Sequence, residues 1–152
     1  MKDHGTKLLF DMFTDASPPM DLQDEGNTGR LIYNVRGGTF EGERLRGIVL
    51  PTCGDWVTIC PGGRLEFDAR ILLRTDDDAL IYINFTGHKM ITDEQVALME
   101  QGKLHRSSDT SYVITPVFET CSPKYAWLKD IRAACHGHRT SEGLQSQFYE
   151  LL

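Results

Sequence analysis

The chain has 152 residues, a length typical of one domain. Its 16 Lys and Arg against 22 Asp and Glu give a net charge of −6, and 40% of its residues are hydrophobic. Nucleic acid and anionic membrane surfaces demand a basic face, and a disordered chain holds less apolar surface. We therefore expect a single folded domain, residues 1–152, that binds neither nucleic acid nor a membrane.

Targeting segments and metal-binding motifs are missing from the sequence. The start, Met1–Gly5, lacks the apolar region of a signal peptide, and no stretch approaches the roughly 18 apolar residues of a membrane span. None of the four cysteines forms a C-x-x-C pair, which favours reduced thiols and a cytoplasmic location. His136 and His138 share one side of an expected strand, but no third ligand is spaced to join them. We expect no metal and no cofactor.

Short strand-like runs fill most of the chain. A first strand at Leu8–Phe13 precedes a polar segment, 14–29, which we expect to be a flexible loop. Glycine, proline and aspartate turns separate the later runs. Strands at this spacing predict an antiparallel barrel or sandwich. The later runs are Arg30–Arg36, Thr39–Phe40, Arg46–Leu50, Trp56–Cys60, Arg64–Thr75, Ala79–Thr86, Ser111–Glu119, Ile131–His138 and Gln145–Leu151.

Two short helices interrupt the strand pattern. Thr92 and Gln95 form a capping box, which predicts a helix over 93–101 that stops at Gly102. Together with the polar residues that follow, this helix occupies segment 90–110. Ser122 and Pro123 are a second helix start, for a turn that runs through Trp127.

The hairpin 64–86 is the best-defined element of the sequence. A three-residue loop, Asp76–Asp78, pairs Leu73 with Ile81 and Ala69 with Phe85. Nearly all odd positions are then apolar, and this face packs in a core. The even face carries polar residues, and it either meets solvent or lines a polar cavity.

Four polar side chains converge on this even face. Asp68 and Arg70 come from one strand, and Tyr82 and Asn84 come from the other, with Asn84 opposite Arg70. A carboxylate, a guanidinium, a phenol and an amide can bind a polar substrate group and move a proton. The same residues also suit a solvated surface with cross-strand polar pairs.

Two further places combine an acid with large aromatic residues. Asp55 beside Trp56 can be a general base in an apolar setting, or an Asx turn that ends a loop. Phe118 lies next to an acid and close in sequence to Trp127, an arrangement that suits either the wall of a ligand site or an ordinary barrel lid. No strong catalytic motif, such as G-x-S-x-G or H-E-x-x-H, is present.

Several motifs, in order along the chain, resemble the family called domain of unknown function 3237, or uncharacterised protein family 0311. The resemblance implies a closed, antiparallel, roughly eight-stranded β-barrel, lipocalin-like in outline, that forms a homo-oligomer. It also marks segment 90–110 as an inserted helix and loop. The residues that match the family pattern are Asp55, Trp56, Asp68, Arg70 and Tyr82. The motifs are Gly37–Gly42, Leu45–Gly47, Val49–Pro51, Gly54–Trp56, Leu65–Arg70, Arg74–Asp77, Ala79–Tyr82, Phe118–Thr120 and Tyr125–Leu128.

Three functions are compatible with these observations. The first is a cofactor-independent lyase, isomerase or cyclase that acts on an aromatic or phenolic molecule in the barrel. Arg70 then stabilises an oxyanion, Asp55 or Asp68 is the base and Tyr82 transfers a proton. The second is a non-catalytic, lipocalin-like carrier, and the third is an interaction module. For the first, the residues expected to surround the ligand are Trp56, Tyr33, Asn84, Tyr112, Phe118 and Trp127.

Overall fold

The computed structural model describes residues 5–22, 29–90, 94, 112–140 and 142–152. Within these residues the protein is an antiparallel all-β structure with one short 3₁₀ helix, η2 (Pro123–Lys129), as the sequence predicts. The strands are β1 (Thr6–Ala16), β2 (Met20–Asp21), β3 (Gly29–Glu41), β4 (Arg46–Val49), β5 (Cys53–Cys60), β6 (Arg64–Thr75), β7 (Leu80–Met90), β8 (Tyr112–Glu119), β9 (Arg132–Arg139) and β10 (Leu144–Leu151).

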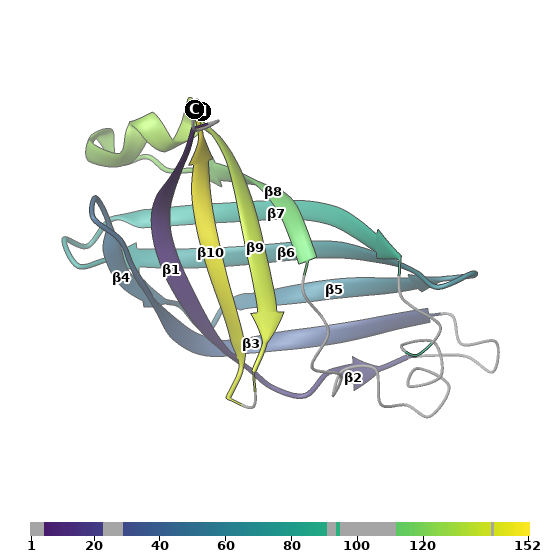
Figure 1. The fold of residues 1–152 in the computed structure, drawn as a ribbon. Helices are drawn as coiled ribbons and strands as arrows, with labels where there is room; N and C mark the ends of the chain where they lie inside the picture. The colour runs from purple at the N-terminus through teal and green to yellow at the C-terminus, as the bar shows by residue number, and fades with distance from the viewer. Residues whose placement is uncertain (1–4, 23–28, 91–93, 95–111, 141) are drawn as a thin grey trace.

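The strand pairs form a closed cycle. The order β1-β10-β9-β8-β7-β6 continues through β4 and β5 to β3, and β3 pairs with β1 again. Because β4 and β5 both lie between β3 and β6, the cycle has eight positions, as expected for the barrel. Figure 1 shows β1, β9 and β10 crossing steeply in front of β3, β5, β6 and β7. The protein therefore has an inner face enclosed between these two groups of strands.

A glycine pair bends β3 where the strand changes partner. Before Gly37, β3 pairs with β5, and from Gly38 onward it pairs with β4. A side chain at Gly38 would place its Cβ 1.9 Å from the carbonyl oxygen of Phe13 in β1, so only glycine permits this close approach. The register with β1 shifts here between Asp15 and Ala16. The glycine pair is therefore a bulge that helps β3 to close on β1.

The β6–β7 hairpin has the predicted register. Leu73 pairs with Ile81 and Ala69 pairs with Phe85, around the three-residue turn Asp76–Asp78. Asp78 has a φ of 66°, the left-handed conformation required at the last position of such a turn. Aspartate tolerates this conformation better than most residues because its short side chain can hydrogen-bond locally.

The odd face of this hairpin lies inside the barrel. Leu73, Ile81 and Ile83 are fully buried there and pack with a cluster of phenylalanines. Within that cluster, the rings of Phe10 and Phe148 stack with centroids 4.5 Å apart. A second cluster lies farther along the same inner face. It consists of Leu31, Val57, Ile59 and Leu65, with Tyr33 and Phe67 packed against it.

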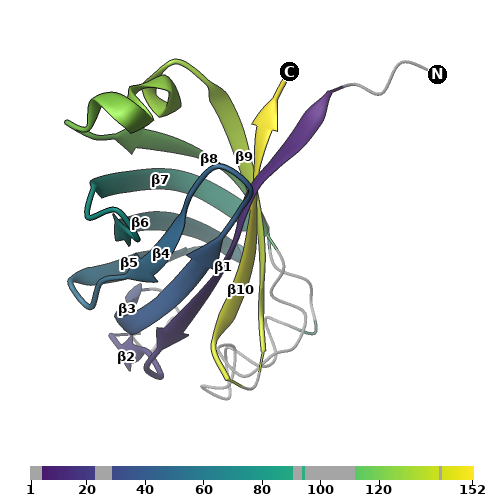
Figure 2. The same ribbon diagram turned by 90° about the vertical axis from the view of Figure 1, so that its left-hand side faces the viewer.

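One end of the barrel is held together by the turn of the β6–β7 hairpin and by η2 (Figure 2). Asp77 accepts hydrogen bonds from Thr75 Oγ1 at 2.6 Å, from Tyr125 Oη at 2.8 Å and from the Lys124 ammonium. The Lys124 hydrogen bond, supported by those from Thr75 and Tyr125, holds the pKa of the Asp77 carboxyl well below its usual range. This contact joins residues 48 positions apart, and the sequence pattern does not reveal it.

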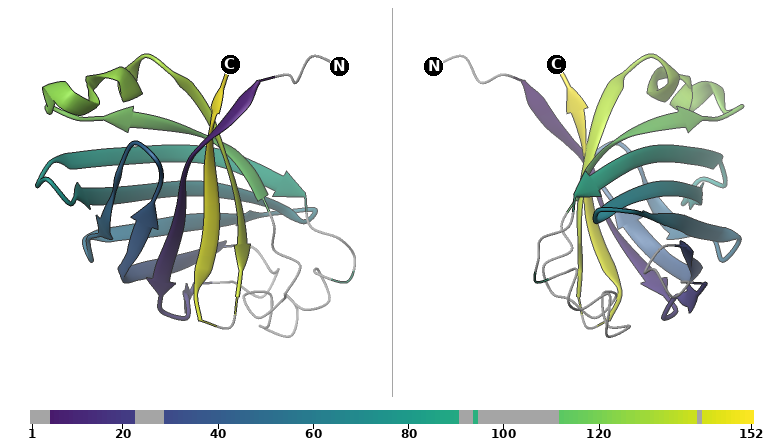
Figure 3. Two further views of the ribbon diagram at one scale, coloured as in Figure 1. Left: turned by 60° about the vertical axis from the view of Figure 1, so that its left-hand side comes forward. Right: turned by 90° about the vertical axis from the view of Figure 1, so that its right-hand side faces the viewer.

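The first part of the chain differs from the sequence prediction. We expected a strand that ends at Phe13 and a loop over 14–29, but β1 continues to Ala16 and β2 pairs with β3. Two views of the chain show β1 and β10 side by side across the other strands (Figure 3). This pairing extends β1 because Thr14 is buried and bonds to β10 through the carbonyl of Leu144. The predicted helix 93–101 and most of segment 90–110 lie outside the described residues.

Candidate functional site

Neighbouring residues of β5 point to opposite sides of the barrel wall. Asp55 and Val57 belong to the inner face, and Trp56 and Thr58 belong to the outer face. The expectation of an Asx turn at Asp55 is wrong, since this residue pairs inside a strand with Tyr33 and Ala69. The indole of Trp56 is not part of the apolar setting of the Asp55 carboxyl, because the side chains of adjacent strand residues point to opposite faces.

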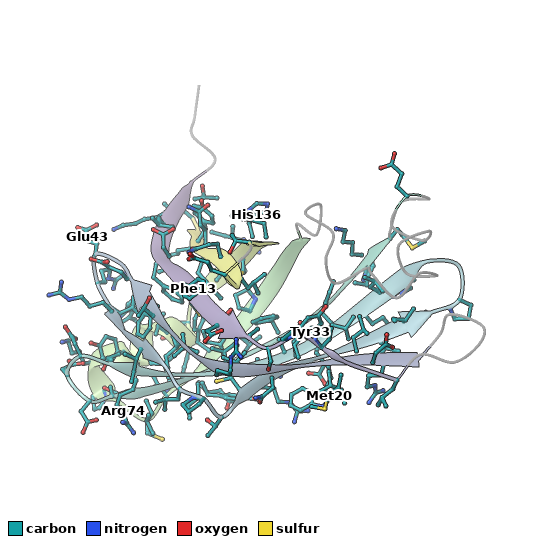
Figure 4. The ribbon with its side chains drawn as sticks, turned by 90° about the horizontal axis from the view of Figure 1, so that it is seen from below. Phe13, Met20, Tyr33, Glu43, Arg74 and His136 are labelled. Carbon is teal, nitrogen blue, oxygen red and sulfur yellow. The ribbon has the colours of Figure 1, made fainter. Side chains whose placement is uncertain are left out.

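On the inner face, an acid and a phenol meet across two strands. Asp55 in β5 lies opposite Tyr33 in β3, and on its other side it lies opposite Ala69 in β6. The Asp55 Oδ1 atom is buried, while both side chains as a whole are half-buried. In Figure 4, Tyr33 is on the side of the sheet that faces β1 and β10, and Met20 and Arg74 are on the opposite side.

Apolar side chains surround this pair. Leu31, Val57 and Phe67 lie opposite one another on β3, β5 and β6, two residues along each strand from the pair. In the row that contains Asp55, Ala69 of β6 is followed by Phe85 of β7. An apolar environment makes each polar contact of a carboxylate stronger than it is in water. A carboxylate there can accept a hydrogen bond or a proton from a ligand, and a phenol can donate one to an oxygen that gains charge.

The four polar side chains of the even face lie outside the barrel. Asp68 and Arg70 are 3.5 Å apart, and their side chains are 43% and 56% exposed. Asn84 pairs with Arg70, and Tyr82 pairs with Leu72, as the hairpin register requires. The structure therefore selects the outer-surface alternative, because the largely apolar odd face occupies the interior. These four residues cannot share one site with Asp55.

The outer face has a shallow pocket of its own. It has a volume of about 350 Å³ and is lined by Arg30, Trp56, Thr58, Asp68 and Arg70. Three of these residues are candidate site residues in the sequence, but Arg30 and Thr58 are not among the residues expected there. Both residues could have been found from the register between β3 and β5, because Arg30 lies opposite Thr58 in it.

The aromatic residues expected to surround a ligand do not gather in one place. Phe118 is only 4% exposed and packs in the core, 6.5 Å from the ring of Phe10 between centroids. Trp127 lies in η2, where the Arg44 guanidinium carbon is 3.4 Å from the centroid of its ring. Tyr112 lies in β8, and its side chain is outside the described residues. Of the five expected aromatic residues, Tyr33 alone is described beside Asp55.

Among the described residues, Cys135, His136 and His138 do not form a second reactive centre. Burial raises the pKa of the Cys135 thiol to about 12, so it is protonated at neutral pH. His136 and His138 are exposed on β9, on the far side from the core residue Cys135. Among the residues described by the structure, no three His, Cys, Asp or Glu side chains are grouped to hold a metal ion.

The described part of the chain also contains no helix that is long and apolar enough to cross a membrane.

Relatives with similar sequences cover nearly the whole chain. Residues 5–151 match the family model "Protein of unknown function (DUF3237)". A UPF0311 protein of Clostridium acetobutylicum is 31% identical over 152 residues, which are 99% of this chain and 96% of the relative. A UPF0311 protein of Rhodopseudomonas palustris is 30% identical over 123 residues, 81% of this chain and 80% of the relative.

Solved structures share the fold. A protein of unknown function from Clostridium acetobutylicum superposes with a TM-score of 0.84 at 28% identity, covering 96% of this chain and 97% of the other. A protein from Acinetobacter baumannii described as β-barrel-like has a TM-score of 0.76 at 34% identity, with 97% of both chains covered. A protein from Penicillium herquei described as an enzyme has a TM-score of 0.69 at 17% identity, which shows the fold alone. It covers 96% of this chain and 93% of the other. From the family match and the relatives together, the chain belongs to the DUF3237 family of proteins of unknown function.

Proposed function

We propose that the protein binds a small aromatic or phenolic molecule against the inner face of β3, β5 and β6 and performs acid/base chemistry on it without a cofactor. Asp55 is the base, and the Tyr33 hydroxyl donates a hydrogen bond to the oxygen that gains negative charge. The observation that carries the proposal is the position of Asp55, opposite Tyr33 on an otherwise apolar inner surface.

Packing alone does not explain a carboxylate in this position. Packing alone favours Val, Ile or Leu, as at the neighbouring inner residues Val57 and Ile59. A carboxylate held beside apolar side chains on the inner face of a barrel is typical of binding and catalytic sites. The aromatic rings of Tyr33 and Phe67 offer flat apolar surface for a ring beside the acid.

The outer acid is less suited to this chemistry. Asp68 and its partner Arg70 are about half exposed, so water screens their charges. Electrostatic stabilisation of a transition state is more effective where water is excluded. The inner face is less accessible to water than the outer face, so it suits this chemistry better. The name of the Penicillium herquei structure is compatible with catalysis on this fold, but it identifies no reaction.

Binding can be tested with 2-naphthol as the probe in calorimetric titrations. We expect Asp55→Asn to weaken binding about tenfold or more, because a hydrogen bond to a charged group contributes roughly 1.5–3 kcal/mol. Asp68→Asn, the matched acid on the outer face of the neighbouring strand, should leave the affinity unchanged. An Asp55→Asn protein that binds 2-naphthol as well as wild type would contradict the proposed site.

Catalysis can be tested with 2-tetralone, an aromatic ketone whose α-protons exchange through an enolate. In D₂O, the wild-type protein should accelerate loss of the α-proton NMR signal, with Asp55 removing the proton and Tyr33 stabilising the enolate oxygen. Loss of the base should reduce this acceleration by about 100-fold or more, the range reported for a positioned base. Binding of 2-naphthol without accelerated exchange would support the non-catalytic carrier instead.

A further inference from the structure

We propose that the outer pocket is a second ligand site, separate from the inner face, and that it takes a planar aromatic carboxylate. The pocket is lined by two arginines, Arg30 and Arg70, together with Trp56, Thr58 and Asp68. Its volume of about 350 Å³ is at the lower end of the range for small-molecule sites.

The indole of Trp56 is fixed by its surroundings. A Cβ added at Gly54 would come within 3.3 Å and 3.4 Å of the six-membered ring of Trp56, so the ring lies over the bare backbone of that glycine. The guanidinium carbon of Arg70 is 5.4 Å from the centroid of the indole, within the range of a cation–π contact. The glycine below the indole and the guanidinium beside it restrict the orientation of the ring, so Trp56 presents a fixed aromatic surface to the pocket.

The charges of the pocket favour a ligand with one negative charge. Two guanidinium groups and one carboxylate leave a net charge of +1, although the whole chain has a net charge of −6. Asp68 lies 3.5 Å from Arg70 and offsets part of its charge. Within the described part of the chain, Arg30 has no carboxylate at ion-pair distance. Arg30 is therefore the stronger anchor, and Arg70 adds a second contact.

Ligand shape and charge act together here. A carboxylate matches the planar fork of a guanidinium, which can donate two hydrogen bonds to it. The ring attached to that carboxylate then lies beside Trp56, where an aromatic pair is more favourable than its buried area alone would make it. A neutral phenol lacks the first interaction, and a small inorganic anion lacks the second. A planar aromatic carboxylate is the ligand class that uses both.

The pocket is independent of the proposed acid/base site. Trp56 and Asp55 are adjacent in sequence but point to opposite faces of β5, and the sheet separates the two ligands. Variants of the inner residue therefore leave this pocket intact, and the two proposals can fail separately.

The experiment uses 2-naphthoate as the probe and the wild-type chain labelled with ¹⁵N. The protein has two tryptophans, and so two indole N–H signals, which Trp56→Phe assigns. We expect 2-naphthoate to shift the signal of Trp56 and not that of Trp127. Arg30→Gln and Arg70→Gln should each weaken binding about tenfold, as for the loss of one charge-assisted contact.

Arg74→Gln is the matched control, because Arg74 lies on the same face of the same strand and pairs with Asp78 instead. Its affinity for 2-naphthoate should stay within about twofold of wild type, the scatter expected of an uninvolved surface charge. Asp55→Asn should also have no effect. The proposal is overturned if the Trp56 signal does not shift at millimolar 2-naphthoate, if both Arg30→Gln and Arg70→Gln bind like wild type, or if Asp55→Asn abolishes binding.

Discussion

The inner and outer faces of β5 and β6 hold the same kinds of side chain in opposite settings. On the inner face, Asp55 lies opposite Tyr33 and next to an apolar cluster. On the outer face, Asp68 lies beside Trp56 and Arg70, about half exposed to water. One face therefore has an acid in an apolar environment, and the other has an acid whose charge is balanced by a guanidinium.

The difference teaches that setting, and not residue type, decides what each acid can do. A carboxylate beside apolar surface interacts strongly with whatever it touches, which suits proton transfer. A half-exposed carboxylate beside arginine is screened, and it mainly adjusts the charge of a binding pocket. We expect the inner face to prefer neutral phenols and the outer pocket to prefer carboxylates.

The largest expected effect comes from placing a second acid on each face. Val57 is 3% exposed in the inner cluster, so Val57→Asp buries a carboxylate without a partner. We expect it to lower the free energy of unfolding by about 3–5 kcal/mol, the cost of an uncompensated buried charge. Urea denaturation followed by circular dichroism measures the change.

Thr58→Asp, one residue later on the outer face, is the matched control. The loss there should be less than about 1 kcal/mol, which reflects only the low strand propensity of aspartate. Equal losses for the two variants would show that the faces do not differ in burial, and the comparison would fail.

The sequence predicts local features of this fold well and the position of its faces less well. Alternation along residues 64–86 specifies the register and separates Ile71 and Leu73 from Arg70 and Arg74. That pattern does not say whether the polar face lines a cavity or meets water. The answer depends on closure of the barrel, which requires β1 to reach β3 across the glycine bulge. Such closure is a property of many strands together.

Contacts between distant segments are the second class of missed features. Arg30 joins the outer pocket because β3 pairs with β5, and Asp77 joins Tyr125 because η2 folds over the hairpin turn. In both cases the sequence contains the residues, but their separation along the chain gives no register. Conversely, residues that are adjacent in the sequence can belong to different sites, since Asp55 and Trp56 lie on opposite faces of β5.

Asp77 is a third kind of acid in this protein, because its carboxylate accepts hydrogen bonds from three side chains. Three hydrogen bonds hold its pKa well below the usual range in the folded protein, while in the unfolded chain its pKa is about 3.9. Its contribution to stability is therefore complete above about pH 5 and is lost as the pH falls through the unfolded pKa toward the folded one. We expect Asp77→Asn to lower the urea midpoint at pH 7, with a smaller difference from wild type at pH 3.

Asp76→Asn is the control for this prediction. Asp76 lies in the same turn, but its side chain is 55% exposed, and its ion-pair partner among the described residues is Arg46, at 3.1 Å. Its urea midpoint should stay close to that of wild type at both pH values. A gap between Asp77→Asn and wild type that is the same at pH 3 and pH 7 would rule out the ionised carboxylate as the source of the stability.

The smallest expected effect is that of Asp68→Asn on the outer face. The ion pair with Arg70 is 3.5 Å long and half exposed, so its loss should change the free energy of unfolding by less than about 0.5 kcal/mol. Removal of the negative charge leaves Arg70 fully available, and affinity for 2-naphthoate should rise slightly, about two- to threefold, the size of a screened surface interaction. Calorimetric titration and urea denaturation of the same preparation measure both quantities. Weaker binding of 2-naphthoate would mean that Asp68 contacts the ligand as a hydrogen-bond acceptor, and the outer face would then resemble the inner one.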